Sequence, residues 1–116
     1  MPNFLSQYMP EAATLTIILS LGSAVAYTGS MAAMKVWTAS PSLTLALIIA
    51  MAIAIGVVFE VQALRAERLG VIYVTILGIE VVLISFVSTV LFGETFSMRE
   101  IVGCALVIGG TALAWA

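Results

Sequence analysis

The stretch from Gly70 to Phe92, GVIYVTILGIEVVLISFVSTVLF, decides the fold of this chain. It is apolar apart from a few hydroxyl side chains and one acidic residue, Glu80. About 20 residues of helix, each rising about 1.5 Å, cross the hydrocarbon core of a bilayer. The stretch therefore predicts a membrane-spanning helix that carries a carboxyl group near its middle.

Three further apolar stretches predict an all-α membrane protein with four spans in a single domain, residues 1–116. The expected spans are residues 12–34, 43–64, 70–92 and 101–116, with short links between them. In the last link, Ser97 stands three residues before Glu100, which is the pattern of a helix capping box. Short links favour antiparallel packing of consecutive helices, so we expect a four-transmembrane-helix bundle.

The composition of the chain excludes several classes of function. Of its 116 residues, 63% are hydrophobic and 9% charged, which is too few charges for a water-facing surface. A net charge of -2 leaves no basic stripe for a nucleic-acid backbone. With no histidine and one cysteine, Cys104, we expect no disulfide, metal site or cofactor. An enzyme is not expected either, because no paired acid and base or activated nucleophile is evident.

The basic residues give no clear orientation in the membrane. Arg65 and Arg68 belong to the side that holds both termini, whereas Lys35 and Arg99 belong to the opposite side. Because an excess of Lys and Arg normally marks the cytoplasmic side, this balance favours insertion in both directions. Two oppositely inserted copies can then pair about an axis in the membrane plane. The alternative is that the amino terminus or a partner protein sets the orientation.

Glu80 is the strongest candidate for a functional residue. An ionisable side chain near the bilayer centre costs at least about 2.5 kcal/mol, so such residues usually have a functional role. We expect Glu80 to bind a proton or a cation. The alternative is a protonated carboxyl that donates one structural hydrogen bond. We interpret Glu60, near the end of its span, as an interfacial residue paired with Arg65.

Polar side chains also recur along one face of the first span. Thr16, Ser20, Ser23, Tyr27 and Ser30 follow helical spacing, and we expect them to line an interior surface that faces Glu80. Tyr73 lies seven residues before Glu80 and shares its helix face. Ser23, Tyr27, Ser30 and Tyr73 are therefore the candidate substrate-binding residues. The alternatives are hydroxyls that bond to their own helix and ordinary packing of the tyrosine rings.

Small residues in the last span predict a surface for dimer packing. Gly103, Gly110 and Ala114 fall on one side of this helix, and small side chains let two helix backbones approach closely. Four short spans enclose little space by themselves. Transport of a solute would therefore require at least a dimer, and the lipid bilayer and a second or homologous copy are the expected partners.

Several short motifs together resemble the small multidrug resistance family. They are Lys35 closing the first span, Gly70-Val-Ile-Tyr73, Val82-Leu-Ile-Ser85, Phe92-Gly-Glu94, and the glycines Gly103 and Gly110. The resemblance covers nearly the whole chain after about residue 15. It implies a multi-pass protein of the bacterial inner membrane that works as an antiparallel dimer. It also implies export of small cations, such as quaternary ammonium or guanidinium compounds, in exchange for protons.

The chain departs from this family at positions that matter for transport. The membrane-embedded glutamate of the family's first span is Tyr27 here, and the second glycine of a Gly-x-Gly motif is Glu80. One interpretation is that the acid has moved to the third span, which gives a proton-coupled exporter of cationic or amphiphilic molecules. Another is a non-transporting accessory subunit of a larger complex or of a heterodimer. A flippase for a lipid or lipid-linked sugar is the third.

Overall fold

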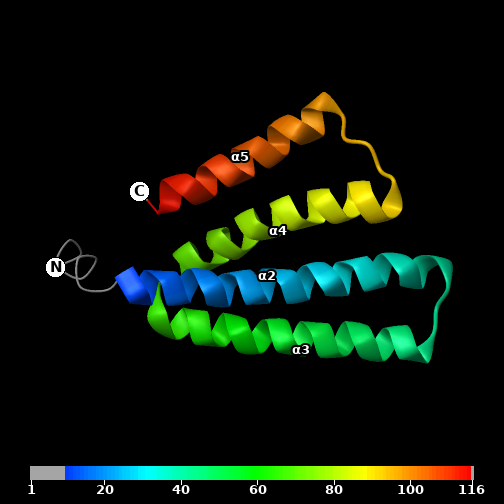
Figure 1. Cartoon of the computed structure of the whole chain (residues 1–116), viewed down its shortest axis with the longest axis horizontal. Coiled ribbons are helices and arrows are strands. Elements are labelled where there is room, and N and C mark those ends of the chain that lie inside the picture. Colours follow the sequence, from blue (N-terminus) through cyan, green and yellow to red (C-terminus); the bar gives the residue numbers. More distant parts are fainter. Residues whose placement is uncertain (1–9, 116) are drawn as a thin grey trace.

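Four helices joined by short links make up the described part of the chain (Figure 1). The structure is a computed structural model that describes the backbone of residues 10–115 and the side chains of residues 14–115. The helices are α2 (Pro10–Ala39), α3 (Leu43–Ala66), α4 (Leu69–Phe92) and α5 (Met98–Ala114). The predicted all-α class is confirmed.

Three of the four helices are long and apolar enough to cross a membrane. These candidate spans are Thr14–Ala39, Leu43–Ala66 and Leu69–Phe92. The remaining helix, α5, has 17 residues, fewer than the about 20 that a crossing usually needs. Ala116, the last residue of the expected fourth span, lies outside the described residues. The structure thus supports a multi-pass membrane protein.

The first helix is longer than the sequence suggested. It continues past Met34 and Lys35 to Ala39, so the link to α3 begins at Ser40 and not at Lys35 as predicted. The reason is local. No residue from Lys35 to Ala39 opposes helix, whereas Pro41 disfavours the helical conformation of the residue before it.

Local side-chain signals define the other helix ends. The Ser42 hydroxyl accepts a hydrogen bond from the backbone N–H of Leu45, 3.1 Å away, and caps α3. The capping box predicted for Ser97 and Glu100 is present at the start of α5. Gly93 ends α4 in a left-handed conformation with φ of 65°, which a residue with a side chain rarely adopts.

The helices lie side by side in the order α5, α4, α2, α3, as an open layer (Figure 1). The described chain measures 52 × 35 × 18 Å, which fits a thin layer. The prediction that consecutive helices are neighbours is wrong for α3 and α4. Both pack on α2, and they touch each other little. A link of two residues reverses the chain direction but does not decide which helix α4 packs against.

Close contact between α2 and α3 depends on glycine. The ring of Phe59 lies over Gly22 and the ring of Tyr27 lies over Gly56, so that each helix fits one aromatic side chain against the backbone of the other. A small apolar core of Ala24, Ala63, Ile72 and Ile76 then joins α2, α3 and α4. Most other large apolar side chains are exposed, which suits helices whose outer surface meets lipid.

Candidate functional site

The polar face of α2 is buried against its two neighbouring helices. Thr16, Ser20, Ser23 and Ser30 are each at most 2% exposed. These residues share one face of α2 because they follow helical spacing. Both α3 and α4 pack on α2, and the buried face points towards the boundary between them. We call this boundary, where α3 and α4 flank the polar face of α2, the seam.

Tyr27 links α2 to α3 through its hydroxyl. It donates a hydrogen bond of 2.7 Å to Oε1 of Glu60. Its ring rests on Gly56, whose lack of a side chain leaves room for it. One turn earlier on α2, the hydroxyl of Ser23 donates to the carbonyl oxygen of Gly56 at 2.9 Å. Two hydrogen bonds and one ring contact therefore fix the rotation of α2 relative to α3.

Glu60 has a different partner from the one that the sequence suggested. We expected an ion pair with Arg65, but in the described part of the chain the carboxylate of Glu60 accepts from Tyr27 instead. Arg65 is exposed near the end of α3. The correction has a simple cause, because residues five apart do not share a helix face. Sequence reasoning missed Glu60 as a site residue. The available signal was its position four residues after Gly56, which places both residues on the same face of α3.

Glu80 lies near the middle of α4 and is partly buried. Its carboxyl is close enough to Glu60 and to Tyr27 to interact electrostatically with both. Tyr27 and Glu60 are in direct contact at the seam, and Glu80 on the third helix interacts electrostatically with both. All four basic residues of the chain, Lys35, Arg65, Arg68 and Arg99, are exposed and lie at or near helix ends.

The other two candidate substrate-binding residues, Ser30 and Tyr73, have different surroundings. The hydroxyl of Ser30 donates to the carbonyl oxygen of Tyr27 at 2.7 Å, within its own helix. Tyr73 is 58% exposed and lies two turns before Glu80 on the same face of α4. Ser30 is thus satisfied within α2, whereas Tyr73 is exposed on the surface of α4.

Two buried hydroxyl groups on α2 have no hydrogen-bond partner among the described residues. They belong to Ser20 and Thr28, which are 0% and 5% exposed. A buried hydroxyl without a partner is costly, and most such groups in proteins are paired. Ser20 lies three residues before Ser23 on the polar face, so part of the bonding capacity of this face is unused.

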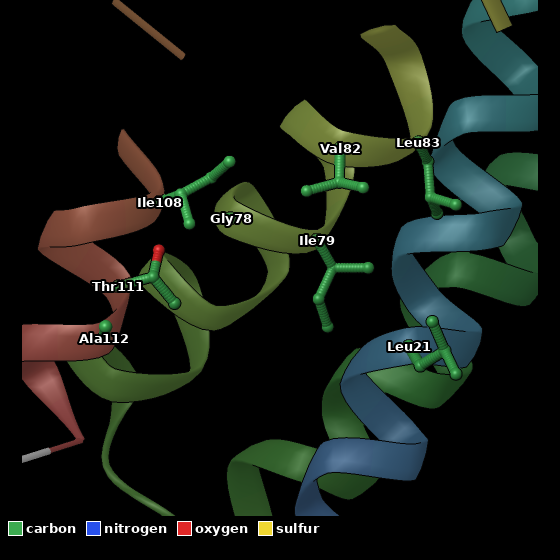
Figure 2. A pocket seen from close by; sticks show the side chains of 8 residues that line it. All are labelled: Leu21, Gly78, Ile79, Val82, Leu83, Ile108, Thr111 and Ala112. Atoms are coloured by element: carbon green, nitrogen blue, oxygen red, sulfur yellow. The ribbon is translucent and has the colours of Figure 1, made fainter. Parts of the chain in front are cut away.

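A separate groove of about 430 Å³ runs between α2, α4 and α5 (Figure 2). Figure 2 shows Ile79 and Leu83 on α4 directed towards α2, with Thr111 and Ala112 on α5 at the opposite wall. The lining is apolar except for Thr111, and Glu80 is not part of it; the full set is Leu21, Gly78, Ile79, Val82, Leu83, Ile108, Thr111 and Ala112. The groove and the seam therefore lie on different sides of α4.

The last helix is attached to α4 by polar contacts. The hydroxyl of Thr111 donates to the carbonyl oxygen of Val74 at 2.8 Å, and Nε1 of Trp115 donates to the hydroxyl of Thr75 at 2.6 Å. Gly103, Gly110 and Ala114, the proposed dimer-packing residues, are exposed. An added Cβ at either glycine would meet no atom within 4 Å, so the described part of the chain leaves this surface uncovered.

Among the described residues, no group of three or more His, Cys, Asp or Glu side chains could hold a metal ion. Cys104 is partly buried, with its Sγ 3.8 Å from the hydroxyl of Ser85. What the seam offers is two carboxyl groups, a phenol and several hydroxyls, which together can bind a cation or exchange protons.

Comparisons with known proteins give no match. No family model matches the chain, and no curated protein or solved structure matches it either. The resemblance to the small multidrug resistance family therefore stays a prediction from the sequence motifs.

Proposed function

We propose that this protein is a small membrane transporter, similar to the small multidrug resistance proteins, that exports cationic or amphiphilic molecules in exchange for protons. The observation that carries the proposal is the position of Glu80, a partly buried carboxyl in the middle of an apolar helix. Such a residue is expensive in a membrane and usually marks a path for ions or substrates.

The surroundings of Glu80 support binding of a cation. Glu60 on α3 and the phenol of Tyr27 on α2 interact electrostatically with Glu80, and neither supplies a positive charge. On α4 itself, Tyr73 offers an aromatic face, which can attract an organic cation. The basic side chains lie at the helix ends, so a proton or a bound cation has to neutralise Glu80.

The mechanism that we propose is alternating access. Glu80 holds either a proton or a cationic substrate, and a change in helix packing exposes it to one side of the membrane and then to the other. Because each occupant displaces the other from one carboxyl, proton entry drives substrate exit. Ser23 and Ser30, whose hydroxyls donate to backbone carbonyls, serve as secondary polar contacts on α2 through their remaining capacity to accept hydrogen bonds.

A dimer supplies the chamber that a single open layer lacks. In the proposed assembly α5 completes a fourth crossing, and the surface of Gly103, Gly110 and Ala114 packs against a second copy. Two copies inserted in opposite directions fit the even division of basic residues between the two sides. The expected location is a bacterial inner membrane, as the family resemblance implies.

Transport by purified protein in proteoliposomes tests the proposal. We expect uptake or efflux of a quaternary ammonium probe, driven by a pH gradient, to fall to background in Glu80→Gln. Glu94→Gln is the matched control, because Glu94 is an exposed carboxyl in the loop between α4 and α5. Unchanged transport in Glu80→Gln would refute the assignment of Glu80.

One observation favours an accessory subunit as the second candidate. Three large apolar side chains on α5, Ile101, Leu106 and Leu113, are between 49% and 76% exposed, and a partner protein can cover them as well as a second copy can. Copurification with another membrane protein at fixed stoichiometry, without proton movement on addition of cations, would favour this alternative. A lipid flippase has no comparable observation in its favour.

A further inference from the structure

The two walls of the apolar groove belong to helices that do not pack against each other. In the described part of the chain, α5 packs on α4 alone, whereas α2 packs on α3 and α4. The floor of the groove is α4, with Ile79 and Leu83 directed towards α2 (Figure 2). Leu21 of α2 and Ile108 of α5 stand on either side of this floor. The groove of about 430 Å³ therefore separates α5 from α2.

The lining of the groove offers almost nothing to water. Its polar side chain is Thr111, whose hydroxyl lies 2.8 Å from the carbonyl oxygen of Val74 and 3.0 Å from that of Val107. The single hydroxyl proton is thus already used. A water molecule inside a protein usually makes two to four hydrogen bonds, which this lining does not supply. The occupant that suits the groove is apolar.

The groove is continuous with the surface that meets the bilayer. Leu21, Val82 and Ile108 line it and are also between 42% and 52% exposed, as are many apolar side chains along the candidate membrane spans. The mouth of the groove therefore opens to the acyl chains of the lipid. Its volume falls within the about 300–1,000 Å³ of pockets for small organic ligands, whereas a helix about 10 Å wide lies across such a mouth.

We propose that this groove holds one acyl chain of a membrane phospholipid as part of the packed protein. In a membrane, apolar surfaces gain little by leaving lipid, so close packing decides what binds. Side chains next to an unfilled space lose their dispersion contacts on that side, and a flexible hydrocarbon chain restores them. The chain contacts both walls and so connects α5 to α2. This inference goes beyond the proposed transport and does not depend on it.

Photo-cross-linking in a bilayer tests the inference. The purified protein is placed in lipid nanodiscs that contain a phosphatidylcholine with a diazirine group midway along one acyl chain. Leu47 and Met51 on α3 are exposed apolar residues outside the groove, so they report contact with bulk lipid. We expect Ile79 and Leu83 to be labelled about fivefold to thirtyfold more than these two, which corresponds to about ten additional carbon–carbon contacts.

Two variants fill the groove from opposite walls. Ala112→Phe places a ring in it from α5, and Leu21→Trp does so from α2. Each should reduce the labelling of Ile79 and Leu83 to the level of the exposed residues on α3. Because α2 does not pack against α5, Leu21→Trp fills the groove without displacing α5. Ala105→Phe is the matched control and should leave the labelling unchanged, since Ala105 is exposed on the same face of α5, two turns earlier and outside the groove.

Equal labelling of the groove and of α3 in the wild type would overturn the inference, because it would show ordinary contact with bulk lipid. Strong labelling that survives both filling variants would overturn it as well. So would protection of Ile79 and Leu83 from the label, which would mean that a second copy or another protein covers the groove. These outcomes leave the transport test of Glu80→Gln unaffected, so the inference and the proposed function fail independently.

Discussion

Replacing Gly56 by alanine should loosen the joint between α2 and α3. An added Cβ at this position would stand 2.7 Å from Cε1 of Tyr27, 2.9 Å from Cδ1 and 3.0 Å from Cζ. Carbon atoms attract each other best at about 3.5–4.0 Å, so the new methyl group overlaps the ring at three atoms. The ring cannot slide away freely, because its hydroxyl is bonded to Glu60.

The expected cost follows from this overlap. Extra atoms in a well-packed contact typically cost about 1–3 kcal/mol, and we expect the free energy of unfolding to fall by that amount in Gly56→Ala. Gly29→Ala is the matched control on α2. A Cβ there would meet no atom within 4 Å, so this variant should keep its stability or gain up to about 1 kcal/mol from better helix propensity.

Unfolding in mixed detergent micelles, followed by the fluorescence of Trp37 and Trp115, measures these differences. A double-mutant cycle identifies the cause. If the methyl group clashes with the Tyr27 ring, Gly56→Ala should cost little in a Tyr27→Ala background, and the cycle should show a coupling of about 1–3 kcal/mol. An equal loss in both backgrounds, or no loss in Gly56→Ala by itself, would refute this account of the joint.

Three further predictions concern α4 and α5. Gly78→Ala should displace α5, because the new Cβ would overlap the side chain of Thr111; we expect a loss of about 1–3 kcal/mol, seen as faster hydrogen exchange in α5 but not in α3. Ser97→Ala should destabilise the first turn of α5 by about 1 kcal/mol, seen as lower protection of its amides, whereas Ser97→Thr should retain the cap. The hydrogen bond from the backbone N–H of Ser97 lowers the pKa of Glu100. The Glu100 carboxylate therefore stabilises the cap fully above the ordinary pKa of 4.5. This stabilisation is lost as the pH falls through the lowered pKa. Protection of this turn should decrease over that acid range in the wild type and stay constant in Glu100→Gln, and the same pH dependence in both proteins would contradict the role of the carboxylate.

The features that the sequence could predict are those set by nearby residues. Ser97 and Glu100 form a capping box over a separation of three residues, and the apolar run of 70–92 needs no tertiary contact to become a helix. The polar face of α2 followed from helical spacing, and the structure buries four of its hydroxyl residues.

The features that it could not predict depend on how helices rotate against each other. Tyr27 and Glu60 are 33 residues apart, and they meet because Gly22 and Gly56 let α2 and α3 approach closely with one rotation. No local pattern specifies that rotation. The sequence also could not predict that α4 packs on α2, because the link Glu67–Arg68 sets the direction of the chain and not the helix against which α4 packs.

The central position of α2 in the layer bears on the order of assembly. This helix is synthesised before α3 and α4, yet its polar face is covered only when both have been inserted beside it. Until then its hydroxyl groups face lipid or the insertion machinery, where bonds back to their own helix carbonyls, as Ser30 makes in the finished fold, reduce the cost. A nascent chain that stops after Ala66 should therefore remain incompletely packed, so the third long helix completes the maturation of the first.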